Sequence, residues 1–265
     1  MLYLPSIAND LRMYQKLDTY ITLFRVGCPV FKSIVIEKDD QLTLENINLI
    51  RNYLGSDYCT LRYQYIRPNF KPVRGGNKIL ITSDHLTRMI VPDTLLWLLE
   101  PIDRLENNYG INLFFNQRTS TLYFECVGRG FDVSDLNRGN ITPHQIILYS
   151  LPIEYGWNNE WWKYAKFFIT SKVQYDTSKK VRIEKLQSLG LTADYSIFDE
   201  NYKPLTSSIL ERLMYFSEQI FSAVCHEEEF VVSCSIDKNS NPVFWDIQTP
   251  TGKINIIGAD QKWQV

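Results

Sequence analysis

The chain has 265 residues, with 28 lysines and arginines against 30 aspartates and glutamates, and 45% of its residues are hydrophobic. This length predicts one or two domains, and the hydrophobic fraction predicts a packed core rather than a disordered chain. The net charge of −2 excludes a strongly basic protein that holds nucleic acid mainly by charge. It does not exclude local patches of charge on the surface.

Neither a membrane span nor a disulfide framework is expected. The longest apolar run, Leu95 to Leu99, is far shorter than the roughly 20 residues of a membrane-spanning helix. Charged residues interrupt positions 1–20, where a signal peptide needs an apolar stretch, so we expect a cytoplasmic protein. The five cysteines include no CxxC pair, and we expect most of them to be small core residues.

Strands and helices are interleaved in the first part of the chain. Residues 33–37 form a short β-branched strand, and apolar residues at helical spacing predict a helix over 44–54 between Thr43 as cap and Gly55 as stop. In the strand that follows, Cys59 and Leu61 alternate with polar residues, which predicts that Arg62 stands on a polar face.

The middle of the chain predicts a hairpin and then helices. Strands at 109–115 and 120–127 are joined by a four-residue turn, and alternation places Glu125 on the face opposite Phe124. We predict helices over 157–168 and about 180–189.

The last part of the chain predicts a helix and a closing hairpin. Ser208 and Glu211 have the spacing of a capping box at the start of the helix. The hairpin that follows has Asp246 and Gln248 on one face of its second strand.

Common catalytic motifs are missing from the sequence. It contains no GxSxG, Walker A, GxGxxG, HExxH or EF-hand pattern. The three histidines, His85, His144 and His226, are far apart in sequence, and we expect surface or hydrogen-bonded structural roles for them.

Two segments combine cations with glycines. Residues 67–78 carry four cations, among them Arg74, beside a Gly-Gly pair; such a loop can wrap anionic oxygens, and a solvated hairpin turn is the alternative. Residues 125–139 carry Arg129 and Arg138 with two aspartates and three glycines. This second segment suits a substrate site, and a surface loop with internal salt bridges is the alternative.

Two further segments place carboxylates at the ends of strands. An apolar strand ends at Glu100 and Pro101, and the closing strand holds Asp246 and Gln248 in register on one face. Taken singly, either feature is also compatible with ordinary polarity at a sheet edge.

Together these segments resemble the ATP-grasp fold, and within it the nucleotide-binding domain of phosphoenolpyruvate synthase and pyruvate phosphate dikinase. The resemblance rests on short motifs that cover most of residues 20–250, listed here in chain order: Gly27 to Ile36, Thr60-Leu61-Arg62, Arg74-Gly75-Gly76, Leu99 to Ile102, and Phe244 to Pro250.

The resemblance implies a role for each matching residue. The cations Lys32, Arg62 and Arg74 would contact the ATP phosphates. Glu100 and Ile102 at the hinge would border adenine. Asp246 and Gln248 on the closing strand would hold Mg²⁺. The family's acidic residue on the preceding strand is replaced here by the segment Ser233 to Ser235, which argues against a site for two magnesium ions. A phosphohistidine domain has no room in this chain.

The resulting hypothesis is an α+β, ATP-grasp-like enzyme with two lobes of mainly antiparallel sheets and flanking helices, divided at 1–100 and 101–265. It would use ATP and Mg²⁺ for phosphoryl transfer to, or ligation of, an unidentified small-molecule or peptide acceptor received by Arg129 and Arg138. Such chemistry depends on positioning and electrostatic stabilisation, so no nucleophile motif is needed.

Two alternatives belong to other classes. One is a non-catalytic protein with a degenerate nucleotide site, for which the aromatic segment 155–164 would bind a protein partner; core packing explains that segment equally well. The other is a binder of single-stranded nucleic acid that uses residues 67–78 with Tyr63 and Tyr65. The net charge of −2 argues against this alternative.

Overall fold

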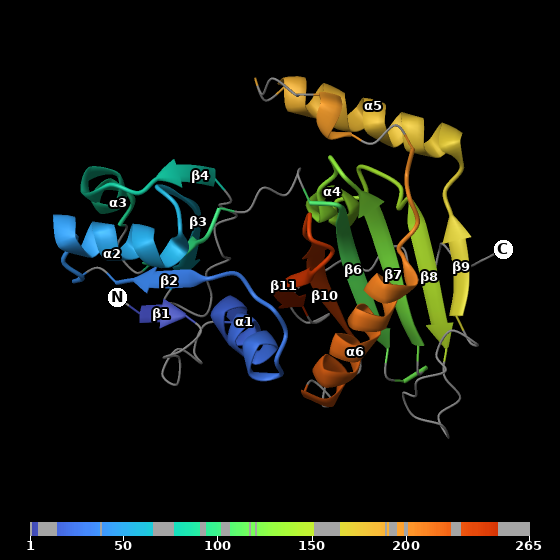
Figure 1. The fold of residues 1–265 in the computed structure, drawn as a ribbon, viewed down its shortest axis with the longest axis horizontal. Coiled ribbons are helices and arrows are strands. Elements are labelled where there is room, and N and C mark those ends of the chain that lie inside the picture. The colour runs from blue at the N-terminus through green and yellow to red at the C-terminus, as the bar shows by residue number, and fades with distance from the viewer. Residues whose placement is uncertain are drawn as a thin grey trace. The chain divides into compact units, whose positions relative to one another are not determined.

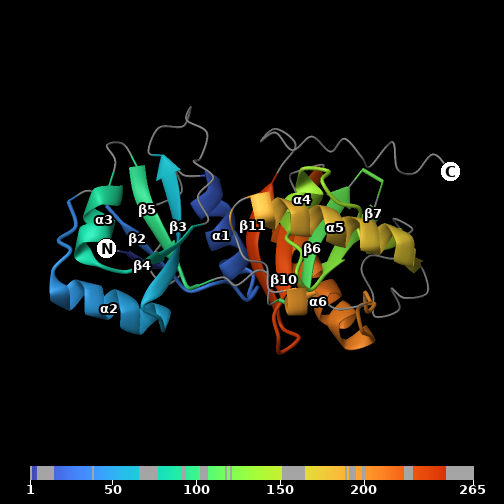
Figure 2. The same cartoon turned by 90° about the horizontal axis from the view of Figure 1, so that it is seen from above.

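The computed structural model describes residues 2–4, 15–37, 39–65, 77–90, 94–101, 107–116, 118–119, 121–150, 165–188, 190, 195–198, 201–223 and 229–248. The chain divides into two compact units, Met1–Asp103 and Arg104–Val265. Each unit contains one antiparallel sheet with helices packed against it (Figures 1 and 2).

The first unit has a five-stranded sheet in the order β1-β2-β5-β3-β4, in which all neighbours are antiparallel. Its elements are β1 (Leu2–Leu4), α1 (Gln15–Arg25), β2 (Ser33–Ile36), α2 (Leu44–Leu54), β3 (Tyr58–Tyr65), β4 (Asn77–Leu80), α3 (Ser83–Met89) and β5 (Thr94–Leu99). Side chains from Leu95 to Leu99 on the central strand β5 are all buried, because helices cover both faces.

The two faces of this sheet have separate cores. Helices α2 and α3 pack on one face, where Ile50 and Leu86 meet Leu61. Helix α1 packs on the other face, where Leu17 and Tyr20 meet apolar side chains of β2 and β5. Burial of apolar surface on both sides therefore holds the first unit together.

Helix α2 begins and ends where its sequence predicts. The Thr43 hydroxyl accepts a hydrogen bond from the Asn46 backbone N–H at 3.2 Å. Gly55 takes a left-handed conformation with φ of 70°, and its N–H donates to the Arg51 carbonyl. Both caps satisfy backbone groups that the helix itself leaves without partners.

The second unit has a six-stranded sheet in the order β11-β10-β6-β7-β8-β9, again antiparallel throughout. Its elements are β6 (Tyr109–Asn116), β7 (Thr121–Gly128), α4 (Val133–Asn137), β8 (Gln145–Ser150), β9 (Ala165–Ile169), α5 (Lys172–Ser188), the 3₁₀ turn η2 (Tyr195–Ile197), α6 (Ser207–Ala223), β10 (Glu229–Ile236) and β11 (Pro242–Gln248).

Helices lie on both faces of this second sheet. Helix α6 packs on one face, where the Phe216 ring lies 5.5 Å from the Phe244 ring. Helices α4 and α5 pack on the other face at one end, where Val127, Tyr175 and Leu186 share a core. The remainder of that second face carries the polar side chains described below.

Two helix predictions in this unit are wrong in part. Residues 165–168, expected to end a helix over 157–168, belong to strand β9, because this segment pairs antiparallel with β8; residues 157–164 lie outside the described ranges. The helix expected at about 180–189 begins at Lys172, where the Ser171 hydroxyl accepts from the Gln174 N–H.

The predicted capping box of α6 is also wrong. The helix begins at Ser207, and the Leu210 N–H donates to the Thr206 carbonyl at 3.0 Å. Ser208 therefore lies inside the first turn, and its hydroxyl is in hydrogen-bond contact with the Thr206 hydroxyl. The residue spacing is that of a capping box, but the helix is capped at Thr206, two residues before Ser208, so Ile209 and not Glu211 stands three residues after the cap.

The predicted fold class is confirmed: the structure is α+β, with antiparallel sheets and flanking helices. The hairpins at β6–β7 and β10–β11 form where the sequence predicts them. In the described ranges, no helix is both long and apolar enough to span a membrane. Cys28, Cys59, Cys126 and Cys234 are buried free thiols, as expected for core cysteines.

Candidate functional site

In the first unit, Lys32 and Glu100 join the start of β2 to the end of β5. The Lys32 N–H donates to Glu100 Oε1 at 3.1 Å, and the Glu100 N–H donates to the Lys32 carbonyl at 2.9 Å. Burial raises the pKa of Glu100, while the hydrogen bond and charge of Lys32 act in the opposite direction. The Lys32 ammonium lies 5.9 Å from the centre of the Tyr53 ring.

Arg62 lies over an aromatic ring on the inner face of the same sheet. It is the register partner of Trp97, and its guanidinium carbon is 5.4 Å from the centre of that ring. The prediction that Arg62 stands on a polar face is therefore wrong, because α1 covers this side of the sheet and Trp97 is buried there. Arg62 itself is half-buried.

Tyr20 on α1 connects these groups. Its ring meets Trp97 edge-on with centroids 5.3 Å apart, and burial raises the pKa of its hydroxyl. Both Glu100 and Arg62 act electrostatically on that hydroxyl, so they lie near it. The structure thus places Arg62 and Glu100 near Tyr20 and Trp97, and Lys32 is joined to Glu100 by hydrogen bonds; we call these five residues the Tyr20 cluster.

The Tyr20 cluster also contains a buried donor without a partner. Trp97 Nε1 has no hydrogen-bond partner among the described residues. Buried polar groups are normally hydrogen-bonded, so each exception asks for a reason. Two other predicted binding residues, Arg74 and Ile102, lie outside the described ranges, as do residues 67–76 of the basic loop and the aromatic segment 155–164.

In the second unit, four polar side chains form a row across four adjacent strands. Asp246 on β11 is paired with Ser233 on β10, Ser233 with Asn112 on β6, and Asn112 with Glu125 on β7. Each of them is at most 5% exposed. We call these four residues the polar row.

Hydrogen bonds link the polar row to Asn137 of α4 and to Gln248 of β11. Ser233 Oγ donates to Asn112 Oδ1 at 3.0 Å, and Asn112 Nδ2 donates to Asn137 Oδ1 at 2.6 Å. Gln248 Nε2 donates to Asp246 Oδ2 at 2.5 Å. The two residues predicted for metal binding, Asp246 and Gln248, are therefore in direct contact.

A β-bulge in β11 aims Asp246 at this face. Ser233 is paired with Asp246 but the next residue, Cys234, is paired with Phe244, so Trp245 is the extra residue. In a regular strand Phe244 and Asp246 would share a face. With the bulge, Phe244 packs against α6 while Asp246 joins the polar row.

The polar row fits one Mg²⁺ ion and does not fit a protein cage for two ions. Three strand steps separate Asp246 from Glu125, about 14 Å at the usual strand spacing, so one ion cannot contact both carboxylates. Among the described residues no three His, Cys, Asp or Glu side chains gather into a metal-binding group. Mg²⁺ commonly takes one or two carboxylates together with substrate phosphates, a requirement that Asp246 with the Gln248 amide meets.

The predicted substrate loop, residues 125–139, contains the end of β7 and the short helix α4. The Arg129 side chain is half-buried, and its Nε has no hydrogen-bond partner among the described residues. Arg138 is exposed at the end of α4. Neither arginine takes part in the ion pairs that Asp135 forms with Arg182 and Lys185.

The two aspartates of this loop have structural roles. Asp132 caps α4 by accepting from the Ser134 N–H at 2.9 Å. Asp135 is buried and forms ion pairs with Arg182 and Lys185 of α5. The salt bridges of the alternative interpretation thus exist, but they join α4 to α5 rather than closing within the loop.

His144 has the hydrogen-bonded structural role expected for it. Its Nδ1 accepts from the Gly128 N–H at 3.1 Å, and its ring lies 4.4 Å from Phe131 and 4.6 Å from Tyr175. Burial lowers the pKa of His144 to about 4. Because Nδ1 accepts, the proton of the neutral ring is on Nε2, which has no partner in the described part of the chain.

The sequence did not single out Asn112 and Asn137 as members of this site. Their only signal is a polar residue at an inward position of a strand and another at a helix end. The alternation of polar and apolar residues within a strand does not tell which strands are neighbours in the sheet. The polar row is therefore identified only from the register of the paired strands.

Comparison with known proteins finds structural likeness without sequence relatives. No protein-family model matches the chain. No curated protein matches it either. The solved structures similar to this chain include a D-alanine-D-alanine ligase from Coxiella burnetii (TM-score 0.44, 12% identity, 92% of this chain and 49% of that one).

Two others are the ATP-grasp ligase PsnB in complex with a minimal precursor (TM-score 0.42, 8% identity, 93% of this chain and 54% of that one) and the ADP complex of purK, an N5-carboxyaminoimidazole ribonucleotide synthetase (TM-score 0.47, 7% identity, 96% and 48%). The chain spans about half the length of these structures. The fold of this chain is defined by its two antiparallel sheets and their flanking helices.

Proposed function

We propose that this protein is an ATP-grasp-like enzyme that binds ATP with Mg²⁺ and uses it for phosphoryl transfer to, or ligation of, an acceptor. The observation that supports this most is the Tyr20 cluster, where Arg62 and Glu100 lie near one buried aromatic pair and Lys32 is hydrogen-bonded to Glu100. Two cations beside aromatic rings suit a nucleotide, because its phosphates need charge and its base needs an apolar surface.

The roles follow from the chemistry of each group. Lys32 and Arg62 would neutralise phosphate oxygens, and Glu100 would border the base. Asp246 and Gln248 would hold the magnesium ion, which supplies charge neutralisation on the phosphates when bound. Arg129 and Arg138 would orient an anionic acceptor. Arg74 and Ile102 keep the nucleotide-binding roles implied by the sequence resemblance.

Nucleotide binding can be tested by thermal stability with and without ATP and Mg²⁺. A ligand at about 100 times its dissociation constant adds roughly 2.7 kcal/mol, which is a measurable rise in melting temperature. We expect this rise in the native protein and its loss in Arg62→Ala. The matched control is Arg88→Ala, which removes an exposed arginine of α3 in the same unit and should keep the rise.

The same measurement separates binding from folding defects. Arg62→Ala also removes a cation–π contact with Trp97, so its rise is compared with its own ligand-free melting temperature. Arg62→Lys keeps the charge and should recover part of the rise. An equal rise in all variants, or no rise in the native protein, contradicts the proposed nucleotide site.

The alternative function is a non-catalytic protein that binds nucleotide without turnover. The observation in its favour is Ser233, a hydroxyl directly opposite Asp246 where a second carboxylate would complete a stronger metal site. Binding of ATP without ADP formation, followed by ³¹P NMR in the presence of Mg²⁺ and a panel of carboxylate acceptors, would favour this alternative. ADP formation that Asp246→Asn abolishes would favour the enzyme.

A further inference from the structure

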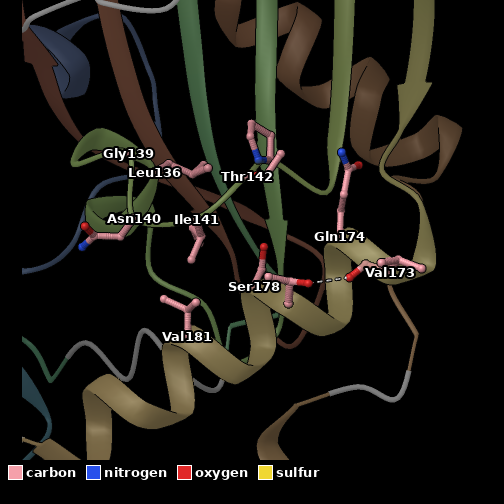
Figure 3. A pocket seen from close by; sticks show the side chains of 11 residues that line it. Leu136, Gly139, Asn140, Ile141, Thr142, Val173, Gln174, Ser178 and Val181 are labelled. Atoms are coloured by element: carbon pink, nitrogen blue, oxygen red, sulfur yellow. Dashed lines mark hydrogen bonds between the residues drawn. The ribbon is translucent and has the colours of Figure 1, made fainter.

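A groove in the second unit runs between helix α5 and the loop that follows α4 (Figure 3). Its volume is about 320 Å³, within the range of natural ligand pockets. Its apolar walls include Ile141 on the loop side and Val173 and Val181 on the helix side. We call it the α5 groove; it contains none of the residues assigned above to nucleotide or metal.

Polar groups without partners line the α5 groove. The Ser178 hydroxyl faces into it, although Ser178 as a residue is only 4% exposed (Figure 3). Within the described ranges, the side chains of Ser178, Gln174 and Thr142 form no hydrogen bond with other protein groups. Buried polar groups normally have partners, so the buried Ser178 hydroxyl can bind a ligand in the groove, and the exposed Gln174 amide can add a second hydrogen bond.

Exposed aliphatic side chains add an apolar component. Val173 is 75% exposed and Val181 is 37% exposed, on the same side of α5 as Gln174 and Ser178. The groove thus offers apolar contact next to hydrogen-bonding groups along one line. This combination matches the side chains and amide groups of a peptide.

The charge around the groove is positive although the whole chain is slightly acidic. Residues 165–188, which carry β9 and α5, contain six cations and two carboxylates, and four cations remain when Arg182 and Lys185, which pair with Asp135, are left aside; the net charge of the protein is −2. Arg138 precedes the lining residue Gly139, and Lys172 precedes Val173. Both cations are exposed and have no ion pair with a described residue, so they are available to an anionic ligand.

We propose that the α5 groove binds an acidic peptide segment that carries aliphatic side chains between its carboxylates. The aliphatic side chains would pack on Ile141, Val173 and Val181, and the peptide backbone would bond with Gln174 and Ser178. Arg138 and Lys172 would pair with carboxylates. A single-stranded nucleic acid fits less well, because none of the lining residues is aromatic and able to stack on a base.

The test measures binding of a fluorescein-labelled Glu-Leu-Glu-Leu-Glu peptide to the full chain by fluorescence anisotropy. Peptides with Gly for Leu, and with Lys for Glu, separate the apolar and charged contributions. We expect the first peptide to bind at least about ten times more tightly than either control, which corresponds to about 1.4 kcal/mol. Arg138→Glu should weaken binding and reduce its dependence on salt.

Val173→Asp and Leu44→Asp form a matched pair of variants. Both residues are aliphatic, lie in the first turn of a helix and are about three-quarters exposed, at 75% and 76%. An aspartate there favours the helix N-terminus, so both variants should fold. We expect Val173→Asp to weaken peptide binding about tenfold or more and Leu44→Asp to leave it unchanged.

Three outcomes would overturn the proposal. These are no saturable binding up to about 1 mM peptide, equal weakening by the two aspartate variants, and equal binding of a short oligothymidylate or anionic lipid vesicles, which would indicate charge alone. Arg62→Ala should retain peptide binding, so failure of the nucleotide site and failure of the α5 groove give different results.

Discussion

At the scale of single residues, the structure assigns different tasks to groups that look alike in the sequence. Arg62 lies over a buried indole, whereas Arg182 forms a buried ion pair with Asp135. Asp246 and Asp132 are both aspartates, yet one belongs to the polar row inside a strand and the other caps a helix. Surroundings, rather than residue type, therefore decide which of these charges is available for chemistry.

His144 should make the stability of the protein depend on pH. The pKa of His144 is about 4 in the folded chain and 6.5 for an ordinary histidine, so the unfolded chain binds the proton first as the pH falls. Stability from this group is complete above about pH 6.5, falls by about 3 kcal/mol down to about pH 4, and does not change further below it.

Urea unfolding at several pH values checks this expectation. His144→Gln should flatten the fall in unfolding free energy between pH 6.5 and 4, whatever its stability at pH 7. His85→Gln removes an exposed histidine from the same chain and should leave the fall in place. Parallel curves for the native protein and His144→Gln would show that this histidine is not the source.

At the scale of elements, one carboxylate holds two helices of the second unit together. Asp135 on α4 is 1% exposed and pairs with Arg182 and Lys185 on α5, which are also largely buried. Removal of one partner from a buried ion pair leaves the other charges desolvated without compensation. The α4–α5 contact also shapes the loop side of the α5 groove, because the lining residues Leu136 and Gly139 lie one and four residues after Asp135.

We therefore expect Asp135→Ala to destabilise the protein by about 3–5 kcal/mol, measured as the free energy of unfolding in urea. Asp176→Ala provides the control, because it removes an exposed carboxylate from α5 itself. That change should stay within about 0.5 kcal/mol of the native protein. A loss below about 1 kcal/mol for Asp135→Ala would mean that solvent reaches this ion pair.

At the scale of the whole molecule, each of the two units has its own core. The described hydrophobic clusters belong to one unit or the other, and the described residues of each unit include two buried cysteines. Burial raises the pKa of Cys28 and Cys59 to about 12, so about one in 10⁴ of these thiols is ionised at pH 8. Modification of these thiols thus requires that their core open.

Cysteine labelling should accordingly report on each unit. With iodoacetamide in increasing urea, we expect Cys28 and Cys59 to react over one range of urea concentrations. Cys126 and Cys234 should likewise react together, as read from peptide masses. Labelling of Cys59 in the absence of urea, or well before Cys28, would contradict cooperative unfolding of the first unit.

The sequence by itself determined the elements whose signals are local. The α2 helix with both of its caps, the β6–β7 and β10–β11 hairpins and the α+β class follow from periodicity, capping residues and turn residues within short windows. The buried cysteines follow from composition in the same way. Local energetics are enough for these features, because the interactions that specify them join residues close in sequence.

Only the tertiary structure decided which side chains meet. The hydrogen bond between Ser233 and Asn112 joins residues 121 positions apart, and the bulge at Trp245 turns Asp246 toward them. Arg62 faces inward because α1 covers its strand, and residues 165–169 form a strand because β8 pairs with them. Strand register and helix packing fix these outcomes, and both depend on contacts between distant parts of the chain that no short stretch of sequence encodes.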